Sequence, residues 1–154
     1  MSEKGKLARA LFEQGYNCCQ SVVGAFAAEM GMELEEAVRL ASAFGGGLGR
    51  LREGCGAVSG MALVAGMLYG YASPTDGENK ARTYGMMQEL ARRFRERNGS
   101  LLCRDLLGPE GTSTDPVPEA RTADYYQRRP CPGLIACAAD LLAELPTWDL
   151  SKEL

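Results

Sequence analysis

The sequence contains no histidine. Histidine is the general base of Ser-His-Asp and Cys-His catalytic sites, a zinc ligand and part of the C-x-x-C-H haem-attachment motif. Its absence excludes these two kinds of catalytic site, zinc sites with histidine ligands, and this haem attachment. None of the six cysteines forms a C-x-x-C pair, which also excludes zinc-ribbon and thioredoxin spacings. The glycine-rich part of the chain has no G-x-G-x-x-G match and no strand before it, which argues against nucleotide binding.

The chain also lacks an excess of positive charge and a long apolar run. Its net charge is −3, so the composition does not favour nucleic acid as a partner. The most apolar stretch, residues 55–70, is shorter than the ~20 residues that a bilayer span needs, so we expect no membrane insertion. The N-terminus leads into an amphipathic segment rather than an apolar signal core, and we therefore expect a cytoplasmic protein.

Apolar residues recur at helical spacing along most of the 154 residues, and no strand pattern has comparable strength. The length suits one domain, residues 1–154. We predict an all-α single-domain bundle of about five to seven helices around a buried central helix at about 55–70, which has no polar face. The spacing predicts helices over residues 7–12, 18–30, 34–44, 55–70, 78–97, 100–107 and 132–145, with one or two turns in 119–127.

The densest glycine lies just before the predicted central helix. A run of glycines lets the backbone adopt positive φ angles and approach other groups closely. This loop delivers Cys55 to the first turn of the helix, so we expect the chemistry there. The predicted cofactor-binding glycines are Gly45, Gly46, Gly47 and Gly49.

Four cysteines fall at or near the starts of four predicted helices: Cys18, Cys55, Cys103 and Cys131. A helix N-terminus offers free N–H groups and partial positive charge, which together favour a thiolate. The other two cysteines, Cys19 and Cys137, continue apolar helix stripes and are interpreted as core residues. Several arginines could strengthen the positive field or point to water instead: Arg50, Arg52, Arg104, Arg128 and Arg129.

These cysteines belong to an ordered series of motifs. They are Gly15-Tyr16-Asn17-Cys18, Phe44 to Arg50, Cys55 to Gly60, Cys103 to Gly108, and Cys131. The series resembles the C-GCAxxG-C-C family of redox-active proteins over about residues 15–145. By position, the family cysteines are those at the four helix starts; Cys19 stands where alanine is more usual, and Cys137 is extra.

The resemblance implies a redox role, often beside a transporter-associated or oxidoreductase partner. A similar module occurs in split-Soret-type cytochromes, where an iron–sulfur centre is associated with it. This chain lacks the haem-binding part, so no haem is implied.

Two functions from different classes remain open. In the first, the four family cysteines bind an iron–sulfur cluster, most plausibly [2Fe–2S], for electron transfer, and the glycine loop supplies N–H groups to its sulfurs. In the second, Cys55 is the nucleophile of a metal-free thiol/disulfide cycle, with Cys18, Cys103 or Cys131 as its partner. Structural zinc held by the four thiolates is a weaker third option. The residues do not decide whether the protein is an enzyme.

The small-residue surface of the 55–70 helix, with Met61 and Met67, could serve as a homodimer contact or as a close-packed core. Both interpretations stay open at this point.

Overall fold

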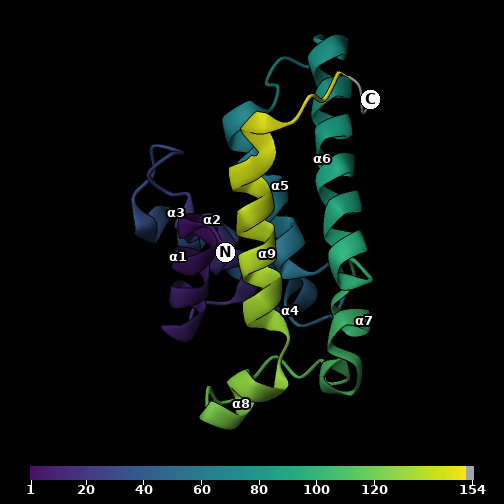
Figure 1. The fold of residues 1–154 in the computed structure, drawn as a ribbon. Helices are drawn as coiled ribbons and strands as arrows, with labels where there is room; N and C mark the ends of the chain where they lie inside the picture. Colours follow the sequence, from purple (N-terminus) through teal and green to yellow (C-terminus); the bar gives the residue numbers. More distant parts are fainter. Residues whose placement is uncertain (152–154) are drawn as a thin grey trace.

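The computed structural model describes residues 1–151 and contains helices without a strand in that range, which confirms the all-α prediction (Figure 1). Among the described residues, six helices have eight or more residues: α1 (Glu3–Glu13), α2 (Cys18–Ala25), α3 (Leu34–Ala41), α5 (Gly56–Tyr69), α6 (Gly77–Asn98) and α9 (Cys131–Glu144). The helices α4 (Gly45–Leu48), α7 (Cys103–Leu107) and α8 (Ala123–Arg128) are shorter. Short 3₁₀ turns follow α3, α7 and α9, at Ser42–Phe44, Gly108–Gly111 and Leu145–Thr147.

Polar caps fix where several helices begin. The Asn17 side chain accepts a hydrogen bond from the Gln20 N–H while the Gln20 side chain accepts one from the Asn17 N–H, so α2 starts with a capping box. The helix stops at Ala25 and not at Met30. The intervening residues form tight turns that keep Phe26 and Met30 buried.

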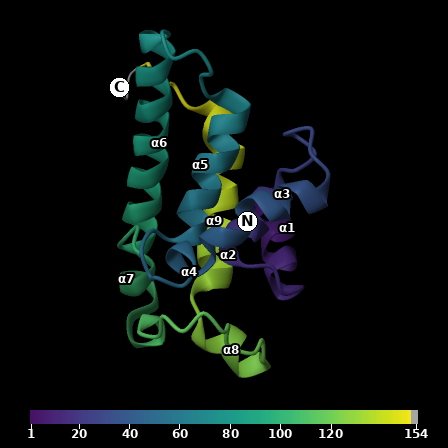
Figure 2. The same cartoon turned by 180° about the vertical axis from the view of Figure 1, so that it is seen from behind.

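The core lies where α9 packs against α1, α2, α5 and α6. Phe94 and Leu90 from α6 and Ile135 and Leu141 from α9 are almost completely inaccessible to solvent. Burial of apolar side chains of this size is the main favourable contribution to folding. At the centre of the bundle, α9 also packs against α5, and the two helices lie side by side in Figures 1 and 2.

The predicted central helix, α5, is buried on one face only. Met61 and Val64 are fully buried against the bundle, whereas Met67 is 61% exposed and Gly66 is also exposed. In the view of Figure 2, α5 lies in front of α9. An absence of polar residues thus did not require burial on all sides.

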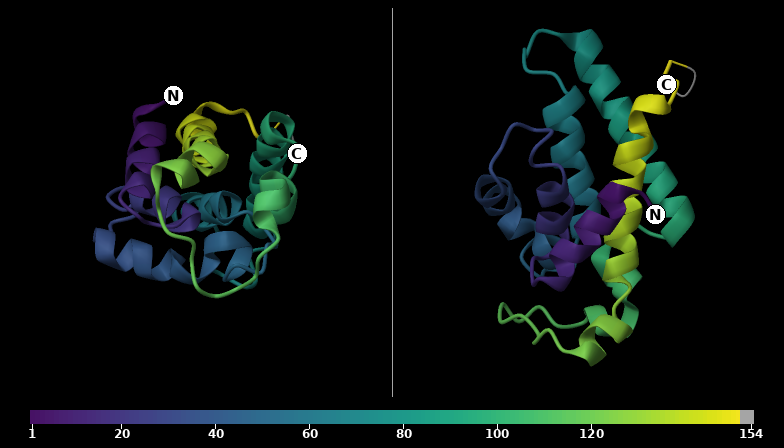
Figure 3. Two further views of the ribbon diagram at one scale, coloured as in Figure 1. Left: turned by 90° about the horizontal axis from the view of Figure 1, so that it is seen from below. Right: turned by 60° about the vertical axis from the view of Figure 1, so that its left-hand side comes forward.

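The starts of α5 and α9 lie at the same end of the bundle (Figures 1 and 2). The segment between α7 and α8 crosses this end, as the view from below in Figure 3 shows. We call residues 112–119 of this segment the crossing segment. None of the helices within residues 1–151 is long and apolar enough to cross a membrane.

Candidate functional site

The four family cysteines lie at four helix starts, as predicted. Cys18, Cys103 and Cys131 are the first residues of α2, α7 and α9, and Cys55 directly precedes α5. All four line one cavity of about 400 Å³, which we call the cysteine cavity. Helices distant in sequence thus bring the predicted site residues together.

A short antiparallel bridge brings Cys55 and Cys103 to the cavity. Gly54 pairs with Leu102, and each cysteine follows one of these two residues. The Cys55 N–H donates to the Leu101 carbonyl oxygen at 2.8 Å, and the Cys103 N–H donates to the Glu53 carbonyl oxygen at 2.7 Å. The backbone on both sides is therefore fixed by hydrogen bonds.

Cys18 approaches the same place from α2. Its Sγ lies so close to Gly56 that a Cβ on this glycine would overlap the sulfur. The Asn17 side chain, next to Cys18, donates to the Ser42 carbonyl oxygen at 3.0 Å and lies against Gly45. The start of α2 is thus connected to both the glycine loop and the start of α5.

The glycine loop forms a left-handed turn. Residues 46–50 all have φ between 59° and 72°, and Arg52 has a φ of 62°. Glycine adopts this region freely, but Leu48, Arg50 and Arg52 each carry a strain of about 1–3 kcal/mol. Such strain persists only where surrounding contacts over-determine the backbone.

The predicted cofactor-binding glycines lie at the cysteines. Gly45, Gly46 and Gly49 line the cysteine cavity. A Cβ on Gly47 would lie 2.6 Å from the Cβ of Cys103, so this residue must stay small. Their role in binding a cofactor stays a prediction.

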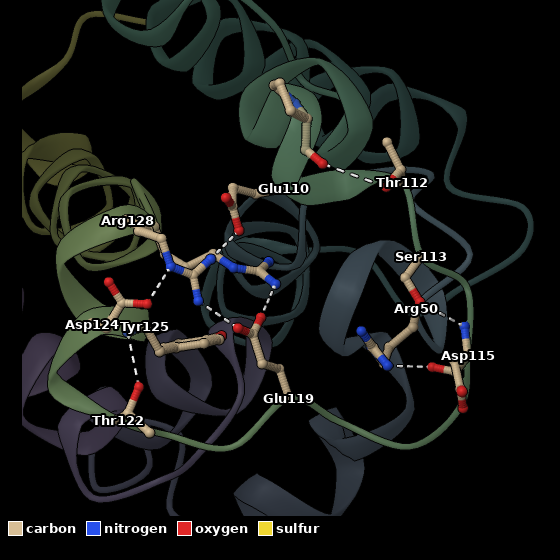
Figure 4. A network of polar contacts seen from close by, with 12 residues as sticks. Arg50, Glu110, Thr112, Ser113, Asp115, Glu119, Thr122, Asp124, Tyr125 and Arg128 are labelled. Carbon is tan, nitrogen blue, oxygen red and sulfur yellow. Dashed lines mark hydrogen bonds and ion pairs between the residues drawn. The ribbon is translucent and has the colours of Figure 1, made fainter.

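Two arginines of the turn hold the crossing segment over the cysteine cavity. Arg50 donates to the carbonyl oxygen of Asp115 (Figure 4) and to that of Val117. The Arg52 side chain, only 5% exposed, donates from Nε to the Ser113 carbonyl oxygen at 3.0 Å. Its Nη1 lies 3.8 Å from the Cys103 sulfur, within hydrogen-bond reach.

Carboxylates and arginines fix the other end of the crossing segment. Glu119 pairs with both Arg128 and Arg129, and Arg128 also pairs with Glu110 and Asp124 (Figure 4). Arg129 is buried and lines the cysteine cavity, whereas Arg128 is exposed and lies outside the cavity lining.

Burial opposes thiolate formation at three of the four cysteines. It raises the pKa of the Cys55 and Cys103 thiols and raises that of Cys131 to about 12. The Arg52 guanidinium lowers the pKa of Cys103, but by less than burial raises it. At these three cysteines, burial therefore outweighs the expected effect of the helix N-termini.

The remaining cysteines lie outside the cysteine cavity. Cys19 is completely buried in the core, in agreement with its interpretation, and Cys137 is half-buried beside the Asn98 side chain. All six cysteines are free thiols. Within residues 1–151, no three cysteine or carboxylate side chains form a group that could hold a metal ion.

Several residues of the site were not predicted from the sequence. Arg121 lines the cavity and donates to the carbonyl oxygens of Phe12 and Tyr16 at 3.0 and 3.1 Å. Phe12 and Tyr125 form part of the apolar wall. No motif marks these residues as part of the site, because their positions there depend on how α1, α8 and the residues just before α8 pack.

A comparison with protein families gives one match. The model described as "Putative redox-active protein (C_GCAxxG_C_C)" matches residues 16–145, a range that includes all four cysteines of the cavity. No match was found among curated proteins or among solved structures.

Proposed function

Because the chain belongs to the C_GCAxxG_C_C family of redox-active proteins, we propose that it transfers electrons through an iron–sulfur cluster in the cysteine cavity. The observation that carries this proposal is that four cysteines from four separate helix starts line one cavity. Four cysteine thiolates are the usual ligands of such clusters.

The residues present fit a cluster better than a single zinc ion. A zinc ion bound by four cysteines needs all of its sulfurs around one point, and within the described part of the chain no three ligands form such a group. A [2Fe–2S] cluster divides its four cysteines between two irons, so no three sulfurs must surround one ion. The cavity of about 400 Å³ also leaves space beside the thiols.

When bound, such a cluster accepts and donates single electrons. The chain would supply the four ligands, hydrogen-bond donors from the glycine turn, and a cover from the crossing segment that limits water. A redox or transporter-associated partner protein would deliver or remove the electron. We propose that this transfer takes place in the cytoplasm, where the sequence predicts that the protein is located.

A metal-free thiol/disulfide cycle is the second candidate. The bridge between Gly54 and Leu102 favours it, because it brings Cys55 and Cys103 to the same cavity as free thiols. However, thiol–disulfide exchange proceeds by thiolate attack, and burial disfavours the thiolate at both residues.

Single Cys→Ala variants of all six cysteines test the proposal. Protein is purified without oxygen, reconstituted with iron and sulfide, and examined by visible absorption. We expect the variants at Cys18, Cys55, Cys103 and Cys131 to lose the cluster bands, and Cys137→Ala and Cys19→Ala to retain them. Retention of the bands in Cys131→Ala together with their loss in Cys137→Ala would contradict the ligand assignment.

A further inference from the structure

The cysteine cavity carries more positive than negative side chains. Arg50, Arg52, Arg121 and Arg129 line it, and Glu119 is the carboxylate among the lining residues. In the described residues, the first three arginines donate to backbone carbonyl oxygens or approach sulfur, without an ion pair to a carboxylate. Positive charge that is partly removed from water and not balanced by a carboxylate is costly unless another anion is present.

Arg129 has an unused donor in this cavity. Its side chain is about nine-tenths buried, and its Nη2 donates to Glu119 at 2.9 Å. Its guanidinium also lies over the Tyr125 ring, 4.9 Å from the ring centroid. Its Nε is the buried side-chain nitrogen or oxygen without a hydrogen-bond partner among the described residues. Buried donors are rarely left unpaired in folded proteins, so this one indicates a missing acceptor.

Arg129 and Arg52 each connect the crossing segment to the cysteines. Arg52 bonds Ser113 and approaches the Cys103 sulfur at 3.8 Å. Arg129 bonds Glu119 and lines the same cavity as Cys131 and Cys103. Each of the two guanidinium groups therefore has one partner in the crossing segment and lines the cavity that holds the cysteines.

We propose that Arg129 and Arg52 balance the negative charge of the four thiolates and their cluster, and that Arg129 Nε–H donates to a sulfur atom in the cysteine cavity. This inference rests on the proposed function. One electron from a one-electron donor adds one negative charge to the cavity, and no bond to the chain forms or breaks. The two fixed cations stabilise that added charge, so they raise the reduction potential and retain the cluster.

The chain offers a matched control in the neighbouring arginine. Arg128 and Arg129 both pair with Glu119, but Arg129 lines the cysteine cavity and Arg128 does not. Arg129→Gln and Arg128→Gln therefore each remove one cation paired with Glu119, and only the first removes a cation from the lining of the cysteine cavity. Arg129→Lys retains the charge without the planar donor group.

Midpoint potentials of the reconstituted proteins are measured by titration with dithionite. At a fixed potential, we expect Arg129→Gln to lower the ratio of reduced to oxidised cluster about tenfold, a shift of about 59 mV for one electron. Arg128→Gln should match the wild type, and Arg129→Lys should lie between them. Equal potentials in loaded Arg129→Gln and Arg128→Gln would overturn this inference alone, whereas a wild type that binds no cluster would overturn the proposed function as well.

Thermal unfolding of the metal-free proteins supplies an independent readout. If Arg129 acts on the sulfurs, Arg129→Gln should destabilise the metal-free protein no more than Arg128→Gln does, because it removes a buried cation whose Nε–H has no hydrogen-bond partner. A much larger fall in Tm for metal-free Arg129→Gln, with an unchanged potential after loading, would show a structural role instead.

Discussion

The Cys18 sulfur lies directly against the backbone of Gly56, the first residue of α5. A glycine is required here because a Cβ would overlap the Cys18 sulfur. Its backbone angles do not require glycine, since its φ is not positive. This contact places a cysteine of α2 beside the start of the helix that Cys55 precedes. The motif glycine after Cys55 thus has a direct physical reason.

Gly56→Ala should impair cluster binding and destabilise the protein by about 1–3 kcal/mol, because the new methyl group overlaps Cys18 and must be accommodated. Gly54→Ala is the control on the other side of Cys55, since nothing lies within 4 Å of its added Cβ. Urea unfolding and visible absorption measure the two effects. A smaller cost of Gly56→Ala in a Cys18→Ala background would confirm the contact, and equal costs in both backgrounds would contradict it.

A second pair of glycines tests the left-handed turn. Gly47 and Gly49 have φ values of 72° and 59°, but only at Gly47 would a Cβ meet other atoms closely, 2.6 Å from the Cys103 Cβ. Gly49→Ala should therefore cost about 1–2 kcal/mol for the left-handed backbone alone. Gly47→Ala should cost about 1–3 kcal/mol more through overpacking. Chemical denaturation checks the difference, and equal costs for the two substitutions would be inconsistent with the described packing.

Arg50 holds the crossing segment through two carbonyl oxygens, those of Asp115 and Val117. Arg50→Ala should speed amide hydrogen exchange within residues 113–118 severalfold while leaving exchange in α9 unchanged. Arg104→Ala is a suitable control, because this arginine pairs with Glu53 outside the crossing segment. Equal protection of residues 113–118 in all three proteins would show that Arg50 does not hold the segment.

The ion pairs of Glu89 predict a pH dependence of stability. Hydrogen bonds from Arg92, followed by those from Arg93, lower the pKa of this nearly buried carboxyl from 4.5 to about 2. Because the folded-state pKa is depressed, the stabilisation is present above pH 4.5 and is lost as the pH falls towards 2. Glu89→Gln should therefore cost about 1 kcal/mol at neutral pH.

The same difference between wild type and Glu89→Gln should vanish near pH 2. Thermal unfolding at several pH values checks this trend. A difference that grows on acidification would have the wrong sign for a depressed pKa.

Much of the fold could be predicted from local sequence signals. Asn17 and Gln20 mark the start of α2, and Gly99, with a φ of 97°, ends α6 where the sequence places the stop. The cysteine positions at helix starts followed from the same signals. These features depend on neighbouring residues, so a single sequence contains them.

Features that depend on tertiary packing could not be predicted in this way. The left-handed φ angles of Leu48, Arg50 and Arg52 oppose the intrinsic preference of these residues. These angles are maintained because the bridge between Gly54 and Leu102 and the crossing segment hold the turn. Leu102 and the crossing segment are both distant from the turn in sequence. The inward position of Arg129 beside the outward position of Arg128 likewise depends on α8, and not on any pattern in the sequence.

The direction of the pKa shift of the thiols also could not be predicted from the sequence. Helix starts were visible in the sequence, but the depth of burial at Cys55 was not, and burial determines the direction of its pKa shift.

The central claim is tested most directly by iron and sulfide analysis, with an absorption spectrum, of wild-type protein purified without oxygen. A [2Fe–2S] site predicts visible bands with about two irons and two sulfides per chain. A colourless protein that binds neither iron nor sulfide, even after reconstitution, would contradict the account and leave thiol/disulfide exchange as the function to test.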